Sequence, residues 1–360
     1  MNLDPRTLMG EEAAVACTSH TRAGGSAQEN AAAQLGVWID ELTGQDLRFG
    51  ADCLTDRIGI MGLSTVESRV SFGGATRLIR CADGWVALPL ARAADIEMLP
   101  ALFEREIGET VLRDPDRRWA EVESLMAESF VNILRDRSAM LGMPLSVMGE
   151  VLAPSVALPA LQVESFGSIE PKRVESLRVL ELAPMWAGPL AGKVLAIAGA
   201  NVAKVESPKR PDGTREGSPT FFEYLNSKKV IKSLDFSDQR AGEELRAMIR
   251  GSDVVIEGSR PRALEQIGID ARQMLRDGEV DIWLSVTGYG RDSNRVAFGD
   301  DAAVAGGLCD TTAPAFTGDA SGDPLTGLAG AVGILAALSV QHRALIDLSM
   351  SRVCAWAAAG

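Results

Sequence analysis

One aspartate stands where a carboxylate could act as a nucleophile. Asp323 lies in Gly322-Asp323-Pro324, immediately before a long apolar stretch that predicts a helix. Free backbone N–H groups and the positive dipole end of such a helix would hold the carboxylate ionised. An ionised carboxylate is a nucleophile at neutral pH without a neighbouring base. The alternative is a plain helix cap, because Asp is common at that position.

A second acidic pair, Asp300 and Asp301, follows Gly299. Adjacent aspartates can indicate metal binding or shared-proton chemistry. Neighbouring residues on a helix or strand point in different directions, so we do not expect this pair to act on one atom. The two histidines, His20 and His342, stand far apart in the chain. The sequence therefore predicts no metal site.

Residues 177–206 read as a strand, a tight turn, a helix and a second strand, which together make one βαβ unit. In the turn, Gly188 allows close backbone approach and Pro189 suits the first helical position. The turn matches neither the GxGxxG nor the P-loop pattern, so it gives no direct support for a nucleotide site. A dinucleotide-dependent oxidoreductase remains an alternative, with Glu206 where an acidic ribose ligand would lie.

Strands and helices alternate through the second half of the chain. Strands are expected near 177–182, 201–206, 230–234, 253–257, 281–286 and 344–348. This alternation predicts an α/β fold with a Rossmann-like parallel sheet and helices on both faces. In such a sheet, ligands bind beyond the carboxyl ends of the strands.

The first half predicts a smaller α+β domain. Asp83-Gly84 between two apolar runs indicates a hairpin, and helical spacing follows over 95–105 and 117–141. A proline-punctuated stretch separates the two halves. We therefore expect an N-terminal helical segment and small domain over 1–152, a linker over 153–175 and the large domain over 176–360.

The charge pattern restricts the partners. A formal net charge of −13 argues against nucleic acid and anionic membranes, which require a basic surface. Five scattered cysteines without a CxxC pair, and no apolar run of signal or membrane length, favour a cytoplasmic protein. One stretch is basic nevertheless, and would suit a small polyphosphate or form a solvated loop. Its residues are Lys204, Lys209, Arg210, Arg215, Lys228, Lys229 and Lys232.

An ordered series of short motifs over about residues 175–353 resembles the family III CoA-transferases, the group that includes formyl-CoA transferase, carnitine CoA-transferase and α-methylacyl-CoA racemase. The series consists of Trp186–Pro189, Lys204–Pro208, Gly213–Arg215, Asn226–Lys229, Asp253–Pro261, Ser285–Gly290, Gly299–Asp301, Gly322–Gly327 and Ile346–Ser349. The resemblance implies transfer of CoA from an acyl-CoA to a carboxylic acid through an aspartyl-CoA thioester on Asp323. It also implies CoA as substrate and product, a homodimer, and no metal, nicotinamide or flavin.

The same resemblance implies a set of CoA contacts. These are Trp186, Ala187, Ser207, Leu234, Gly258, Ser259, Arg260, Gly288 and Tyr289. Three positions depart from the family's basic pattern, because Ser207, Gln266 and Thr287 stand where other members carry a basic residue. Phosphate contacts are then expected to move to Lys209, Arg215 or Lys228.

Residues 73–150 resemble the small domain of the same family, which here precedes the CoA-binding strands instead of following them. This permuted order makes a non-catalytic acyl-CoA-binding subunit an alternative. An acyl-CoA racemase or isomerase is a further alternative, although that branch carries a histidine where this chain has Asp300. The identities of the donor and acceptor acids are not readable from the sequence.

Overall fold

The computed structural model describes residues 25–360, except 65–67, 154–160, 237, 239 and 260. Its centre is a seven-stranded sheet in the order β4-β12-β9-β8-β5-β6-β7. The strands are β4 (Leu161–Ser168), β5 (Arg178–Leu182), β6 (Asn201–Glu206), β7 (Val230–Ser233), β8 (Val254–Glu257), β9 (Ile282–Thr287) and β12 (His342–Ser349). All neighbours pair in parallel except β4, which runs antiparallel to β12.

The chain builds this sheet outward from β5 in both directions. It passes from β5 through β6 to β7, then returns to the other side of β5 and adds β8, β9 and β12. This order is that of a Rossmann sheet, and the reversal places the expected ligand crevice between β5 and β8. The expected α/β fold is therefore confirmed.

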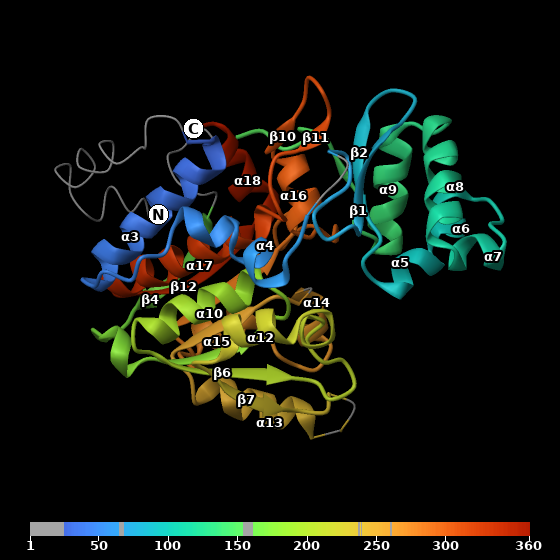
Figure 1. The fold of residues 1–360 in the computed structure, drawn as a ribbon. Helices are drawn as coiled ribbons and strands as arrows, with labels where there is room; N and C mark the ends of the chain where they lie inside the picture. The colour runs from blue at the N-terminus through green and yellow to red at the C-terminus, as the bar shows by residue number, and fades with distance from the viewer. Residues whose placement is uncertain (1–24, 65–67, 154–160, 237, 239, 260) are drawn as a thin grey trace.

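Helices cover both faces of the sheet (Figure 1). They are α10 (Ala187–Ile197), α11 (Thr214–Gly217), α12 (Pro219–Asn226), α13 (Ala241–Arg250), α14 (Pro261–Glu265), α15 (Ala271–Arg276), α16 (Gly299–Ala305), α17 (Gly322–Ser339) and α18 (Met350–Ala358). Strand β8 shows why both faces are covered, because Val254 and Ile256 pack with α10 and α17, whereas Val255 packs with α13 and α15. Successive strand side chains point to opposite faces, so an all-apolar strand needs a helix on each side.

By length and composition, helix α17 could span a membrane, contrary to the expectation that the chain has no apolar run of that length. Of its 18 residues, 89% are buried inside the protein. A mostly buried apolar helix is typical of the core of a globular domain, and α17 packs between α10, α3 and α18.

The start of the described chain belongs to the core of the large sheet. Helix α3 (Ala27–Thr43) buries Leu35, Trp38 and Ile39 in the same apolar core as α10 and α17. The short helices η1 (Ala51–Leu54) and α4 (Asp56–Met61) follow it. The apolar face of this segment, which the expected division placed in one range with the small domain, thus packs on the sheet domain.

The small domain forms a separate lobe beside the sheet (Figure 1). Five helices lie between the second and third strands of its three-stranded antiparallel sheet in the chain. The sheet and these helices share an apolar core of their own. The elements are β1 (Thr76–Arg80), β2 (Trp85–Pro89), α5 (Ala93–Glu97), α6 (Leu99–Phe103), α7 (Glu109–Arg113), α8 (Pro115–Ala127), α9 (Val131–Leu141) and β3 (Ser146–Val147). The hairpin expected around Asp83-Gly84 joins β1 to β2.

The stretch expected to be a linker contains structure. Residues 161–168 form β4, the antiparallel edge of the large sheet, and η2 (Val174–Ser176) follows. Between them, Lys172 forms ion pairs with Asp253 at 2.5 Å and Asp281 at 2.6 Å. The prolines suggested a linker, and Pro171, the one that the structure describes, lies after β4 and outside the strand. A two-stranded ribbon of β10 (Cys309–Asp310) and β11 (Ala315–Phe316) completes the described elements.

Candidate active site

Asp323 lies at the meeting point of two helix N-termini. It is the second residue of α17, and its carboxylate accepts a hydrogen bond from the backbone N–H of Ala187, the first residue of α10. Ser321 holds the N-cap position of α17, so Asp323 is not the cap. The carboxylate is therefore placed by tertiary contact between α17 and α10, which the sequence around Asp323 could not show.

The turns that lead into these two helices are both strained. Met185, before α10, has φ of 70°, and Ala320, before α17, has φ of 43°. Non-glycine residues with positive φ cost energy and persist where the surroundings hold them, often at functional sites. Here the two turns bring Ala187 and Asp323 together.

The surroundings of Asp323 raise its pKa. The side chain is half-buried, and its carboxylate lies among packed protein atoms. This burial raises the pKa of Asp323 to about 7, against the opposing effects of Arg57 and the Ala187 N–H, while Asp300 adds to the rise. Burial thus opposes the stabilisation of the ionised form that the start of the helix was expected to provide. Near neutral pH both forms of Asp323 are present.

Asp300 and Asp301 have separate partners, as expected for adjacent residues on a helix. Asp300 accepts hydrogen bonds from Oγ1 of Thr76 and from the N–H of Ala320, both at 2.9 Å. Asp301 accepts from the N–H of Phe298 at 2.7 Å and from a serine of the small domain. Burial raises the pKa of Asp301 to about 8, and burial raises the pKa of Asp300 as well.

Three residues outside the second half also reach this cluster, and sequence reasoning missed them. Thr76 and Ser146 come from strands of the small domain and bond the two aspartates of α16. Arg57 comes from α4 and bonds Asp319, four residues before Asp323. The bonded residues are about 150 to 260 positions apart in the sequence, and a local sequence pattern cannot predict contacts over such separations. The site is therefore assembled from both halves of the chain.

Three of the implied CoA contacts lie at the crevice between β5 and β8. Trp186 is buried against Phe221, with ring centroids 5.1 Å apart, and Ala187 opens α10. Gly258 follows β8 and is exposed, and a Cβ there would stand 2.9 Å from Cβ of Ala183. The glycine is therefore required by the close approach of the two strand ends, as the sequence suggested for a backbone-lined site.

The other implied contacts follow the neighbouring strands. Ser207 is half-buried after β6, Leu234 is buried after β7, and Ser259 donates to Glu257 at 2.9 Å. Gly288 is buried after β9, where its carbonyl accepts bonds from two serines near the start of α18. Arg260 lies outside the described residues.

Tyr289 is turned toward the small domain. Its hydroxyl contacts Ser146 at 2.6 Å, Glu150 at 2.9 Å and Arg295 at 2.9 Å. Burial raises the pKa of Tyr289 well above its ordinary value. The hydroxyl therefore joins the two lobes, and only the ring is left for a contact with a ligand.

Much of the basic stretch is structural. Lys204 and Lys229 are buried and pair with Glu181 at 3.0 Å and 2.7 Å. Arg215, an expected phosphate contact, pairs with Glu206 at 2.8 Å. Glu206 is the residue expected to bind a ribose in the oxidoreductase alternative, so each of the two has a partner within the protein. Buried charges need partners, which explains the acidic residues among these cations. Of the stretch, Lys209, Arg210, Lys228 and Lys232 are exposed on the surface, and Lys209 pairs with Asp235 at 3.1 Å.

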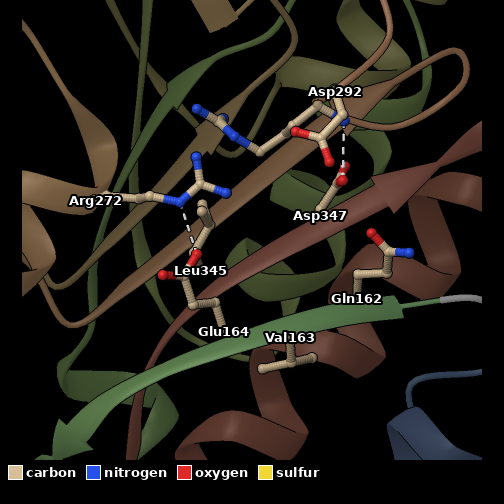
Figure 2. A pocket seen from close by; sticks show the side chains of 8 residues that line it. Gln162, Val163, Glu164, Arg272, Asp292, Leu345 and Asp347 are labelled. Carbon is tan, nitrogen blue, oxygen red and sulfur yellow. Dashed lines mark hydrogen bonds and ion pairs between the residues drawn. The ribbon is translucent and has the colours of Figure 1, made fainter.

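A small polar cavity lies at the far edge of the sheet, between β4, β12 and α15. Figure 2 shows Arg272 of α15 directed toward Glu164 of β4, with which it forms a hydrogen bond at 2.7 Å. Gln162, on the same strand as Glu164, also lines the cavity. Asp347 lies on the opposite side of the cavity. The volume of the cavity is about 140 Å³, well below the roughly 300–1,000 Å³ typical of ligand pockets. Its lining includes none of the expected site residues, so we do not assign it to CoA.

The fold and this cluster define a Rossmann-type protein with a half-buried aspartate, Asp323, held at the start of α10, the helix that follows β5. Residues 174–359 match the model of CoA-transferase family III. The chain belongs to this family.

Curated relatives support the assignment. The chain is 31% identical over 185 residues to a formyl-CoA:oxalate CoA-transferase of Rhodopseudomonas palustris, covering 48% of this chain and 44% of that protein. It is 31% identical over 165 residues to a succinate–glutarate CoA-transferase of Agrobacterium fabrum, covering 42% and 41%. The chain thus spans somewhat under half the length of the curated relatives it matches.

Among solved structures, a CAIB/BAIF family protein from Brucella suis is 28% identical to this chain, with a TM-score of 0.47. That likeness covers 52% of this chain and 55% of the other. The family match begins at residue 174, so it leaves out Arg57 and the small domain.

Proposed function

We propose that this protein is a CoA-transferase that moves CoA from an acyl-CoA donor to a carboxylic acid acceptor, with Asp323 as the nucleophile. The observation that carries the proposal is the position of the Asp323 carboxylate, at two helix N-termini beside the ligand crevice, with a pKa of about 7. Membership of the family supports the class of reaction. Acyl-CoA and a free carboxylic acid are then the two substrates.

In the first half-reaction, a carboxylate oxygen of Asp323 attacks the thioester carbonyl carbon, and CoA leaves as a thiolate. The product is a mixed anhydride between the acyl group and Asp323. The thiolate then attacks the Asp323 carbonyl carbon, which releases the donor acid as a carboxylate and leaves an aspartyl-CoA thioester. Each step forms one bond and breaks one, with no net proton transfer.

The second half-reaction runs the same steps in reverse with the acceptor. The acceptor carboxylate attacks the aspartyl-CoA carbonyl and expels the CoA thiolate, which gives a new anhydride. The thiolate attacks the acceptor carbonyl, so the acceptor leaves as its CoA ester and Asp323 is restored. The N–H groups of Ala187, which already bonds Asp323, and of Gly188 at the start of α10 are suited to stabilising oxyanions that develop at Asp323.

For CoA itself, we propose contacts from Trp186, Ala187, Ser207, Leu234, Gly258, Ser259, Arg260, Gly288 and Tyr289. Their common position after parallel strands supports this set. Calorimetry with free CoA and with NAD tests it, and we expect binding of CoA alone. Arg260→Ala should weaken CoA binding by about 1–3 kcal/mol if Arg260 pairs with phosphate. Tighter binding of NAD than of CoA would contradict the assignment.

Trapping of the covalent intermediate tests the reaction. The protein is incubated with formyl-CoA, succinyl-CoA and other acyl-CoAs, treated with hydroxylamine, and analysed by peptide mass spectrometry. We expect a hydroxamate on the peptide that contains Asp323, and none in Asp323→Asn. Asp277→Asn, an exposed aspartate remote from the site, is the matched control and should label as wild type does.

Two results would count against the proposal. An Asp323→Asn protein that transfers CoA at the wild-type rate would exclude Asp323 as the nucleophile. Binding of CoA without any adduct across the panel would favour a non-catalytic acyl-CoA-binding subunit. The racemase alternative gains no support. Asp300 stands where the racemase branch carries its histidine base, and both of its carboxylate oxygens already accept hydrogen bonds within the protein.

We also propose a homodimer in the cytoplasm. The edge strand β7 exposes Val230 and Ile231, which supports a further protein contact there. The described cysteines, Cys53, Cys81, Cys309 and Cys354, are free thiols, in keeping with a reducing compartment. Light scattering at micromolar concentration tests the dimer, and a clean monomer would exclude it.

A further inference from the structure

Arg57 connects the start of the chain to the candidate active site. It lies in α4, well before residue 174, where the family match begins. Its guanidinium donates from Nε to Oδ2 of Asp319 at 2.8 Å and from a terminal nitrogen to Oδ1. A two-point bond of this kind fixes both the position and the plane of an arginine.

A ring and a glycine hold Arg57 from the remaining sides. The guanidinium stands over Trp186, with its carbon 5.3 Å from the ring centroid. A Cβ built on Gly73 would lie 3.5 Å from a terminal nitrogen of Arg57, so the loop before β1 packs against it. The Arg57 side chain keeps 20% of its surface exposed, whereas the Asp319 side chain has none. Arg57 is therefore held in a single geometry beside the crevice.

The charges around Asp323 are otherwise acidic. Asp300 from α16 and Asp319 from the turn before α17 raise the pKa of Asp323. Cys354 from α18 also lies close, because the charge of Asp323 contributes to the raised pKa of the Cys354 thiol. Arg57 has the largest effect in the opposite direction, on Asp300 as well as on Asp323. A carboxylate that must be ionised to attack needs such a charge, because burial favours its neutral form.

We propose that Arg57 is a positioning residue for the reaction at Asp323, locked by Asp319 and Trp186 so that its charge favours the ionised form of the nucleophile. The segment before the family-matched half would then complete the active site. The proposal rests on the proposed function, because it assigns Arg57 a task in that reaction. It gives the N-terminal helices a role beyond covering the core.

The test follows the ionisation of Asp323 in Arg57→Met and Arg57→Lys. The rate of the trapped adduct is measured from pH 5.5 to 9, and the Asp323 carboxyl is titrated by ¹³C NMR, assigned with Asp323→Asn. In Arg57→Met we expect the Asp323 pKa to rise by about one pH unit or more. Adduct formation at pH 7 should then fall about fivefold or more and recover at pH 9. Arg57→Lys keeps the charge and should keep the wild-type midpoint.

Control variants separate this role from a structural one. Arg113→Met, at an exposed arginine of α7, should leave both the rate and the midpoint unchanged. If Arg57→Met does not fold, Arg57→Gln serves instead, because its amide can still donate to Asp319 but carries no charge, and it should raise the Asp323 midpoint in the same way. An unchanged midpoint in a folded Arg57→Met or Arg57→Gln would overturn the proposal.

The two proposals can fail separately. If wild type forms no adduct, the proposed reaction fails, but the NMR titration still shows whether Arg57 controls the ionisation of Asp323. If wild type forms the adduct and Arg57→Met loses rate equally at every pH, the reaction stands and the role of Arg57 is refuted.

Discussion

Oδ2 of Asp323 lies so close to Gly299 that a Cβ built on this glycine would stand 2.3 Å from it. The same Cβ would lie 2.4 Å from the carbonyl oxygen of Ala320, whose backbone is held in the strained turn before α17. We expect Gly299→Ala to displace the carboxylate and to destabilise the fold by about 1–3 kcal/mol through overpacking. Urea unfolding and hydroxylamine trapping measure the two effects.

Gly108→Ala is the matched control for this change. Gly108 has φ of −62°, and a Cβ there would meet no atom nearer than 4.0 Å. Its stability and its adduct yield should equal those of wild type. If Gly299→Ala behaved like this control, the close approach of Gly299 to Asp323 would be wrong.

A pH dependence of adduct formation follows from the raised pKa of Asp323. Only the ionised carboxylate attacks a thioester, so the rate at saturating acyl-CoA should increase with pH and level off above about 7, the pKa of Asp323. Single-turnover trapping from pH 5 to 9 measures this profile. A rate that is constant over this range, with adduct on Asp323, would show that the site holds the carboxylate fully ionised.

The same pKa has a consequence for stability. The folded protein binds the Asp323 proton more tightly than the unfolded chain does, because the pKa rises from 3.8 to about 7. The contribution of Asp323 to the free energy of unfolding therefore falls as pH rises from about 4 to 7. Asp323→Asn cannot lose a proton, so its stability should fall less over this interval than that of wild type. Thermal unfolding at pH 5 and pH 8 compares the two proteins, and equal losses would contradict the raised pKa.

The contact between the lobes depends on the hydroxyl of Tyr289. Tyr289→Phe removes a group that contacts Ser146, Glu150 and Arg295, and leaves polar partners of the network unsatisfied. We expect a loss of about 1–3 kcal/mol in the free energy of unfolding. Affinity for CoA should stay the same, because the ring is retained. Urea unfolding measures the loss of stability, and calorimetry on the same samples measures the affinity for CoA. A large loss of CoA affinity with unchanged stability would contradict both expectations and would assign the hydroxyl to CoA binding.

The sheet was readable from the sequence because buried parallel strands have a local signature. Short apolar runs such as Val254–Ile256 alternate with helices, and all six predicted strand ranges agree with the structure within a few residues. The edge strand β4 has a mixed, half-exposed pattern, which is why residues 161–168 read as a linker. A strand of this kind is defined by its partner β12 and not by its own composition.

The candidate site was readable only in its local part. Asp323 stands out because it opens a long helix, whereas Arg57 and Thr76 reach the same cluster from segments more than 200 residues away. The basic stretch shows the opposite error, since clustered cations suggested a ligand while Lys204 and Lys229 in fact have buried carboxylate partners. Burial and pairing are properties of the tertiary structure, so charge patterns alone could not distinguish the two uses.

The last prediction concerns Glu181, whose carboxylate lies buried between Lys204 and Lys229 under the ligand crevice. Burial alone would raise the pKa of Glu181, but the two ammonium groups hold it below its ordinary value. Glu181→Ala would leave both lysines without this partner in the core, so we expect a loss of about 3–5 kcal/mol in the free energy of unfolding. Glu109→Gln, at an exposed pair on α7, is the control and should change little. A Glu181→Ala protein as stable as this control in urea would contradict the prediction, and would show that Asp212, which pairs with Lys204 at 3.1 Å, and the nearby carbonyl oxygens suffice for the two lysines.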